Sequence, residues 1–429
     1  MNKKKLLIIS TLIIILTLGL SSILINAGNS DKTEWETYTD YKVNQKVSFE
    51  NNIYSCIQSH TSLPGWEPVL TPALWKLESG TNTTKVTEKP TTTSKVTLKA
   101  TSKTTPKTTP KTTSKATSTT LADNNNDSND SGSWNSKIFA PYVDVCLYPA
   151  FDLNNCYDKT GQKFYTLAFI TANGSGEPAW GGIIPLSDDQ FKDQIDTLRN
   201  NGGDVIVSFG GASGNELATV TSDVDLLVSK YQEVIDKYNL KWVDFDIEGA
   251  AVSNKESIDV RNKAIKILQE KNPELKIAFC LPALPQGLTT DGLYVIENAK
   301  DNGVIVDLVN VMAMDYGDGA APNPQGQMGK YAIDSAEKTL DQIKGLGLDS
   351  KIGVTPMIGQ NDVQSEVFTL EDAKEVLDWA NSNNDVSLLS MWSATRDNGS
   401  GGESGTANAT YSGIIQNEFD FINIFKNFK

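Results

Sequence analysis

Histidine is almost absent from this sequence: its 429 residues contain one, His60. From residue 61 onward the chain therefore has no Ser-His-Asp triad, no Cys-His pair and no histidine-ligated metal site of the kind that carbohydrate deacetylases use. The cysteines are also few, Cys56, Cys146, Cys156 and Cys280, and they form no CxxC pair or zinc-finger spacing. We therefore expect neither a metal nor a cofactor. Cys146 and Cys156 are near enough in sequence to pair in an oxidising compartment, and two unpaired thiols are the alternative.

Positive charge is in deficit as well. The sequence has 38 Lys and Arg against 53 Asp and Glu, a formal net charge of -15. This balance argues against nucleic acid or an anionic membrane as the partner, whereas a neutral polysaccharide needs no charge match. No GxGxxG and no phosphate-binding loop occurs, which disfavours an open doubly wound nucleotide-binding sheet.

Long apolar runs are missing after the N-terminus. Lys3 to Lys5 precede an apolar run over residues 6–25, and Ala27 is followed by polar sequence. This pattern predicts a secretory signal over residues 1–27 and a secreted, extracellular protein without membrane contact once the signal is removed. Ile25 is not the small residue expected before a cleavage site, so an uncleaved anchor is the alternative.

A Thr-, Ser- and Lys-rich segment divides the rest of the chain. Within residues 80–133, lysines recur at every fourth position from Lys95 to Lys115. Such composition cannot form a core, and regularly spaced like charges favour an extended linker. We therefore expect a small module at 31–79 and a larger domain at 134–429.

The larger domain alternates strand patterns with helix patterns. The expected strands are 138–147, 164–171, 205–209, 242–247, 276–281, 308–314, 352–355 and 388–392, and the clearest expected helices are 188–200, 224–238, 259–270, 332–346 and 370–381. Eight strands separated by helix-length connections predict an α/β fold of the (β/α)₈ TIM barrel type.

One strand carries three acidic residues at strict alternation, Asp244, Asp246 and Glu248. On a strand they share one face, while Trp242, Val243, Phe245 and Ile247 make the outer face apolar, so the carboxylates are expected inside the barrel. Neighbouring members would lie about 6 to 7 Å apart, close enough for repulsion and burial to raise a pKa. Such a group keeps its proton near neutral pH and can act as an acid.

Two other interpretations of this strand are less favoured. An acidic edge strand facing water is disfavoured by the apolar outer face, and a site of three carboxylates around a metal lacks any histidine. Carboxylate chemistry remains, and glycoside hydrolysis is its commonest form on a barrel.

Together with the acidic strand, residues 208–211 (Ser-Phe-Gly-Gly), residues 312–315 (Met-Ala-Met-Asp) and Trp392 give the sequence a clear resemblance to family-18 glycoside hydrolases, the chitinases. The resemblance implies that Glu248 is the acid and base, and that Asp246 holds the substrate's N-acetyl group, which acts as nucleophile. It also implies that Asp244 and Ser208 tune Asp246, and that Trp392 forms the floor under the reactive sugar. Met312, Asp315, Tyr316 and Gln360 complete the expected substrate-binding set.

Two positions depart from the family pattern. Lys241 stands where the family motif usually begins with Asp, and Met314 stands where strand six usually has Tyr. Tyr316, on the other side of Asp315, is a candidate replacement for that Tyr. We expect Lys241 to be remote from substrate.

The small module is rich in aromatic residues: Trp35, Tyr38, Tyr41, Phe49, Tyr54, Trp66 and Trp75. Exposed rings of this kind stack on sugar rings. Residues 54–68 and 72–75 resemble the type-5/12 chitin-binding modules, small all-β carbohydrate-binding domains, which implies that Trp66 is the main chitin contact with Glu67, Pro68 and His60 beside it. Trp35, Tyr54 and Trp75 are expected in its core. A small all-β protein-interaction module is the alternative.

The sequence thus predicts a secreted, monomeric chitinase that binds chitin or N-acetylglucosamine oligosaccharides and cleaves their β-1,4 linkages by a substrate-assisted, retaining mechanism. The alternatives are an endo-β-N-acetylglucosaminidase acting on glycoproteins and a catalytically idle chitin-binding surface protein.

Overall fold

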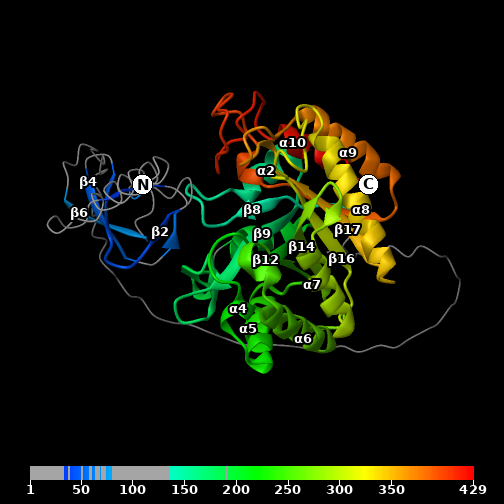
Figure 1. Ribbon diagram of the computed structural model, residues 1–429, viewed down its shortest axis with the longest axis horizontal. Coiled ribbons are helices and arrows are strands. Elements are labelled where there is room, and N and C mark those ends of the chain that lie inside the picture. The colour runs from blue at the N-terminus through cyan, green and yellow to red at the C-terminus, as the bar shows by residue number, and fades with distance from the viewer. Residues whose placement is uncertain are drawn as a thin grey trace, which may run out of the picture.

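The computed structural model describes residues 33–36, 39–49, 52–57, 60–62, 68, 74–79, 136–189 and 191–429 (Figure 1). The expected signal segment, residues 1–27, and the whole expected linker, residues 80–133, lie outside these residues. Among the helices of the described part, none is long and apolar enough to cross a membrane.

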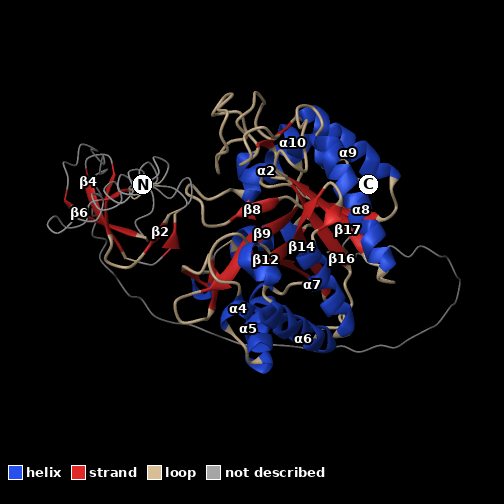
Figure 2. Cartoon of the chain, viewed as in Figure 1, coloured by secondary structure: helices blue, strands red, loops and turns tan. Residues whose placement is uncertain are grey.

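Parallel strands close into a barrel in the larger domain (Figure 2). In barrel order they are β7 (Ile138–Phe139) with β8 (Tyr142–Asp144), β9 (Phe164–Ala172), β12 (Asp204–Gly210), β13 (Trp242–Asp246), β14 (Lys276–Leu284), β16 (Leu308–Ala313), β17 (Lys351–Pro356) and β20 (Val386–Leu389). β20 pairs with β7 and β8 pairs with β9, so the sheet returns to its start. The predicted TIM barrel is confirmed.

The first position of the barrel is split between two short strands, where the sequence predicted one strand over 138–147. Pro141 separates them because it has no N–H to give to a ladder. The residues on either side of Pro141 still pair with β20 and the residues after it. Ala140 N donates to Leu389 O at 2.9 Å, and Tyr142 N donates to Met391 O at 3.1 Å. On the other side Pro141 O accepts from Thr166 N at 2.9 Å.

Helices follow the strands and surround the barrel (Figure 2). They are α2 (Leu153–Thr160), α3 (Lys192–Asn200), α4 (Leu217–Val220), α5 (Val224–Tyr238), α6 (Lys255–Lys271), α7 (Thr290–Asp301), α8 (Met328–Gly345), α9 (Leu370–Ser382) and α10 (Asp420–Phe425). The expected helices are present with shifted ends. The one expected over 188–200 starts at Lys192, because Asp189 and Phe191 have positive φ. α6 starts before residue 259 because the Asn254 side chain accepts from Ser257 N and caps the helix.

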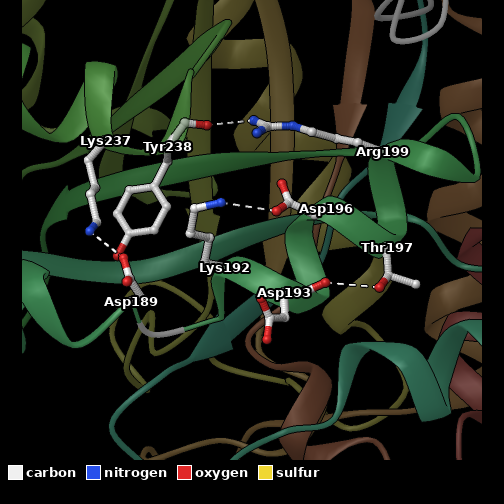
Figure 3. Close-up of polar contacts among 8 residues, drawn as sticks. All are labelled: Asp189, Lys192, Asp193, Asp196, Thr197, Arg199, Lys237 and Tyr238. Carbon is white, nitrogen blue, oxygen red and sulfur yellow. Dashed lines mark hydrogen bonds and ion pairs between the residues drawn. The ribbon is translucent and has the colours of Figure 1, made fainter. Parts of the chain in front are cut away.

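Polar contacts join α3 to the end of α5 (Figure 3). Arg199 of α3 donates to Tyr238 O at 2.7 Å, and its Nε contacts the Asp204 carboxylate at 2.8 Å. Lys237 of α5 pairs with Asp189, just before α3. These contacts fix two adjacent helices against the strand that begins at Asp204.

Successive side chains of β13 point to opposite faces of the barrel wall, as the geometry of a strand requires. Val243, Phe245 and Ile247 are buried between barrel and helices, where the Phe245 ring stacks on Phe209 at 5.5 Å. Trp242 does not join this outer face, which corrects the sequence-based expectation. It has the same parity as Asp244 and therefore packs inside the barrel with Ala278 and other small or aliphatic residues.

Short elements decorate the barrel: β10 (Pro178–Trp180), β11 (Ile184–Pro185), β15 (Gly287–Leu288), β18 (Gly359–Gln360), β19 (Val367–Phe368) and the 3₁₀ turns Leu186–Asp188, Gly249–Ser253 and Ala394–Arg396.

The N-terminal module is all-β in its described part. Its sheet has the order β1 (Thr33–Glu34), β3 (Lys46–Phe49), β4 (Asn52–Cys56), β6 (Trp75–Ser79), and β2 (Asp40–Tyr41) pairs with β5 (His60–Thr61). Trp35, Tyr54 and Trp75 are buried in its core, as predicted, together with Tyr41. The Tyr41 and Trp75 rings meet edge to face at 4.9 Å.

Candidate active site

The three alternating carboxylates lie at the C-terminal end of the barrel, where βα loops form the active sites of TIM barrels. Asp244 and Asp246 belong to β13 and are 3% and 5% exposed. Glu248 follows Ile247, whose N–H still pairs with Cys280 O at 3.0 Å, and Glu248 keeps extended backbone angles. Extended backbone through residue 248 keeps all three side chains on the inner face. Gly249, with φ of 55°, then turns the chain away.

Asp244 is the innermost of the three and is held by two hydroxyl groups. Ser208 Oγ on β12 donates to its Oδ2 at 2.6 Å, and Tyr142 OH on β8 donates to the same atom at 2.8 Å. Burial raises the pKa of Asp244 to about 6, while the two hydrogen bonds act in the opposite direction. Ser208 therefore contacts Asp244, the residue together with which it is expected to tune Asp246.

A buried polar chain continues from Tyr142 across the barrel, and sequence reasoning missed it. Asn310 Nδ2 on β16 lies 3.3 Å from Tyr142 OH and 3.5 Å from Cys280 Sγ, and Thr355 Oγ1 on β17 donates to Asn310 Oδ1 at 2.9 Å. The available signal was a polar residue in the middle of each apolar strand. Buried polar groups need partners, so such residues are expected to meet inside the barrel.

Asp246 and Glu248 form a coupled pair. Burial raises the pKa of Asp246 well above its usual value, and the negative charges of Glu248 and Asp244 raise it further. Burial also raises the pKa of Glu248, whereas its hydrogen bond with Asp246 lowers it. The pair thus holds a proton at a pH where an ordinary carboxyl group would have lost it, with Asp246 as the more strongly shifted member.

Asp315 lies at the mouth, directly after β16, with φ of 51°. The residue is exposed to solvent, yet partial desolvation of its carboxyl group raises its pKa. The negative charge of Asp315 in turn raises the pKa of Glu248. Its Oδ1 accepts from Val363 N at 3.0 Å. The buried Glu366, which sequence reasoning also missed, secures the same loop by accepting from Tyr316 N at 3.1 Å and Gly317 N at 2.8 Å.

Aromatic side chains form a floor beside the carboxylates. Trp392 and Phe169 stack with ring centroids 5.6 Å apart, and Tyr142 lies 6.1 Å from each ring. Met312 packs in the same cluster, and Trp392, Phe169 and Met312 are only partly buried. The structure therefore brings Trp392 and Met312 together as expected and adds Phe169, which no sequence motif marked.

Two other predicted residues are turned away from the carboxylates. Tyr316 is buried in the core and contacts Tyr331 of α8 edge to face at 6.2 Å. The buried Gln360 uses its side-chain amide to hold the backbone carbonyls of Asn361, Gln364 and Glu366, each at 3.1 Å. The structure shows no contact from either to Asp246 or Glu248.

In the small module, Trp66 and Glu67 lie outside the described residues. His60 lies in β5, and Pro68 is buried, so Pro68 does not present its ring to solvent in the described part of the module.

Cys146 and Cys156 are free thiols, so of the two alternatives left open by the sequence the structure has the unpaired residues. Cys156 is buried in α2, whereas Cys146 lies against Gly181, where an added Cβ would come within 2.6 Å of its Sγ.

Among the described residues, no group of three or more His, Cys, Asp or Glu is arranged to hold a metal ion. The barrel mouth thus combines two carboxyl groups of raised pKa with a partly open aromatic floor.

Comparisons with known proteins cover both parts of the chain. Residues 34–76 match the model of carbohydrate-binding module family 5/12. The chain is 38% identical over 282 residues to a probable bifunctional chitinase/lysozyme of Escherichia coli and 38% identical over 280 residues to endochitinase 11 of Metarhizium anisopliae. Each match covers 62% of this chain, but only 31% and 53% of those relatives.

A solved structure is similar over nearly its whole length. Active domain 2 of the Pyrococcus furiosus chitinase, solved as a catalytic-site mutant with chito-oligosaccharides, has 36% sequence identity and a TM-score of 0.63. The match covers 69% of this chain and 96% of that chain. With its barrel and its alternating Asp244, Asp246 and Glu248, the chain belongs to the family-18 chitinases.

Proposed function

We propose that the protein is a chitinase that hydrolyses the β-1,4 linkages between N-acetylglucosamine units. The observation that carries this proposal is the position of Asp246 and Glu248 at the mouth of the barrel beside the floor of Trp392 and Phe169, where burial raises the pKa of both carboxyl groups. An acid next to a flat apolar surface can protonate a glycosidic oxygen while the sugar ring stacks. The relatives named as chitinases support the same substrate class.

In the proposed reaction, Glu248 gives its proton to the glycosidic oxygen as the bond to the anomeric carbon breaks. The acetamido oxygen of the same sugar attacks that carbon, and Asp246 orients the acetamido group and stabilises the positive charge of the resulting oxazolinium ion. Asp244, held by Ser208 and Tyr142, places a second negative charge behind Asp246. Water activated by Glu248 then opens the ring with retention of configuration.

The proposal extends to the rest of the chain. Residues 1–27 act as a secretory signal, residues 31–79 bind chitin, residues 80–133 serve as a linker, and residues 134–429 act as an extracellular, monomeric catalytic domain. The family 5/12 match supports the binding role.

The products of digestion test the proposed substrate. Mass spectrometry of digests should show soluble N-acetylglucosamine oligomers released from colloidal chitin and an unchanged glycan profile on a high-mannose glycoprotein treated in parallel. Release of the glycan instead of chitin oligomers would indicate an endo-β-N-acetylglucosaminidase. No release from either substrate would indicate a chitin-binding protein without activity.

The module should affect insoluble substrate only. Deleting residues 31–79, or changing Trp66→Ala, should reduce retention on insoluble chitin while leaving turnover of soluble oligomers nearly unchanged, because a linker connects the two parts. Sedimentation with chitin and kinetics on chitohexaose measure the two effects. Equal losses in both assays would show that the module contributes to the catalytic site.

A further inference from the structure

A fourth inward-facing carboxylate, Asp144, lies at the barrel mouth and has no part in the reaction described above. It is the last residue of β8, two positions after Tyr142, whose hydroxyl group contacts Asp244 inside the barrel. The intervening Val143 is packed in the outer core. Alternation therefore places the Asp144 side chain on the inner face, one step closer to the mouth than Tyr142.

The neighbours of Asp144 belong to the aromatic floor. Asp144 pairs in register with Ala168 on β9, and Ala168 precedes Phe169, which stacks on Trp392. Ala168 itself packs in the floor cluster with Tyr142. The Asp144 carboxylate is thus held beside the floor on the strand that joins β9, whereas Glu248 approaches from β13.

One oxygen of this carboxylate is unused by the protein. Oδ1 accepts from Cys146 N at 2.9 Å, a local turn that fixes the side chain. Oδ2 has no hydrogen-bond partner among the described residues, and the side chain is only partly buried. Burial raises its pKa to about 6, so the group is ionised at neutral pH. A desolvated carboxylate with a free oxygen favours a hydroxyl or amide N–H donor.

The loop that follows adds an exposed aromatic ring. Tyr148, four residues after Asp144, is 93% exposed, the largest exposed fraction among the large hydrophobic side chains of the described residues. A carboxylate at the end of a strand and an aromatic ring on the loop that follows it are two components that can recognise a sugar: the first binds its hydroxyl or amide groups, and the second stacks on its apolar face.

We infer that Asp144 and Tyr148 form a sugar-binding subsite for a second N-acetylglucosamine unit of the chain, beside the reactive sugar. Asp144 accepts a hydrogen bond from this unit at the base of the subsite, and Tyr148 stacks on the oligosaccharide at its rim. This inference rests on the proposed chitinase function, and it assigns these residues to binding rather than to bond cleavage.

Affinity for a long oligosaccharide tests the inference without turnover. In a Glu248→Gln background, Asp144→Asn should weaken chitohexaose binding by about 5- to 30-fold in calorimetry, the effect of losing one charge-assisted hydrogen bond. Asn keeps the Cys146 contact through its own Oδ1, so the loop should stay folded. Tyr148→Ala should weaken binding in the same direction. In the otherwise native enzyme, both changes should raise KM for chitohexaose more than they lower kcat.

Asp158→Asn is the matched control, because Asp158 is an exposed carboxylate on the same segment, in α2. It removes the same charge and should leave affinity unchanged. The inference would be overturned if Asp144→Asn kept the native affinity for chitohexaose. It would also be overturned if both variants lost affinity equally, because such a loss would reflect net charge alone. Failure of the native enzyme to cleave chitohexaose would instead contradict the proposed function.

Discussion

Changing Glu248→Gln is expected to lower the rate of chitin hydrolysis by about 100-fold or more, the usual contribution of general acid catalysis. Gln keeps the shape of the side chain but cannot donate the proton that the leaving oxygen needs. The measurement is the initial rate of reducing-end release from chitohexaose. Asp246→Asn should also be severe, because Asp246 is proposed to hold the acetamido group.

Lys241→Ala provides the control for this variant. Lys241 is exposed and precedes the first residue of β13, so it lies at the opposite end of the strand from Glu248. Its loss should change the rate only mildly. A Glu248→Gln enzyme with nearly native turnover would show that the acid lies elsewhere.

The pH profile of the native enzyme should show the same proton. Burial raises the pKa of both Asp246 and Glu248, so the pair keeps its proton above the range of an exposed carboxyl group. Activity should therefore persist in that range and fall as pH rises through the raised pKa, when the proton is lost. The residual activity of Glu248→Gln should lack this fall.

Removing the acetyl groups from the substrate should abolish cleavage almost completely. If the acetamido oxygen is the nucleophile, fully de-N-acetylated chitosan lacks the attacking group although its backbone is the same. A cyclic thiazoline mimic of the intermediate should compete with substrate, because it resembles the state that the site stabilises. NMR of the first products, recorded before mutarotation, should show the β-configuration.

Two results would contradict this mechanism. Rapid cleavage of fully deacetylated polymer would show that the enzyme supplies its own nucleophile, and α-configured first products would show inversion. Either would leave Glu248 working with an enzyme carboxylate, Asp246 or Asp315.

Much of the fold was predictable because it depends on local patterns. The buried strands and amphipathic helices repeat at barrel spacing, and alternation alone placed Asp244, Asp246 and Glu248 on one face. Two expectations from the sequence were wrong: the extent of the first strand, and the face of the barrel on which Trp242 lies. Pro141 breaks the first strand because it has no N–H, and Trp242 lies inside the barrel because it has the same parity as Asp244.

The site was only partly predictable, because its supporting contacts join distant strands. Tyr142 reaches Asp244 across 102 positions, and Asn310 reaches Tyr142 across 168. No local pattern reports such a contact. Tyr316 shows the converse problem: its place beside Asp315 suggested the mouth, but the loop secured by Glu366 carries it into the core against α8.

The pairing of the first barrel strand with the last one affects how the domain folds during synthesis. The strand's edge is completed by its last partner, since Ser390 Oγ donates to Ala140 O at 2.7 Å over a separation of 250 residues. During synthesis the N-terminal part of the chain is made first. The strand Ile138–Phe139 therefore has an unpaired edge until its partner, Val386–Leu389, has been made. Contacts of such long range form slowly, and open edges invite aggregation in the meantime. Folding of the catalytic domain should accordingly finish only after synthesis has passed residue 390, and truncations before that point should yield insoluble protein rather than a weaker enzyme.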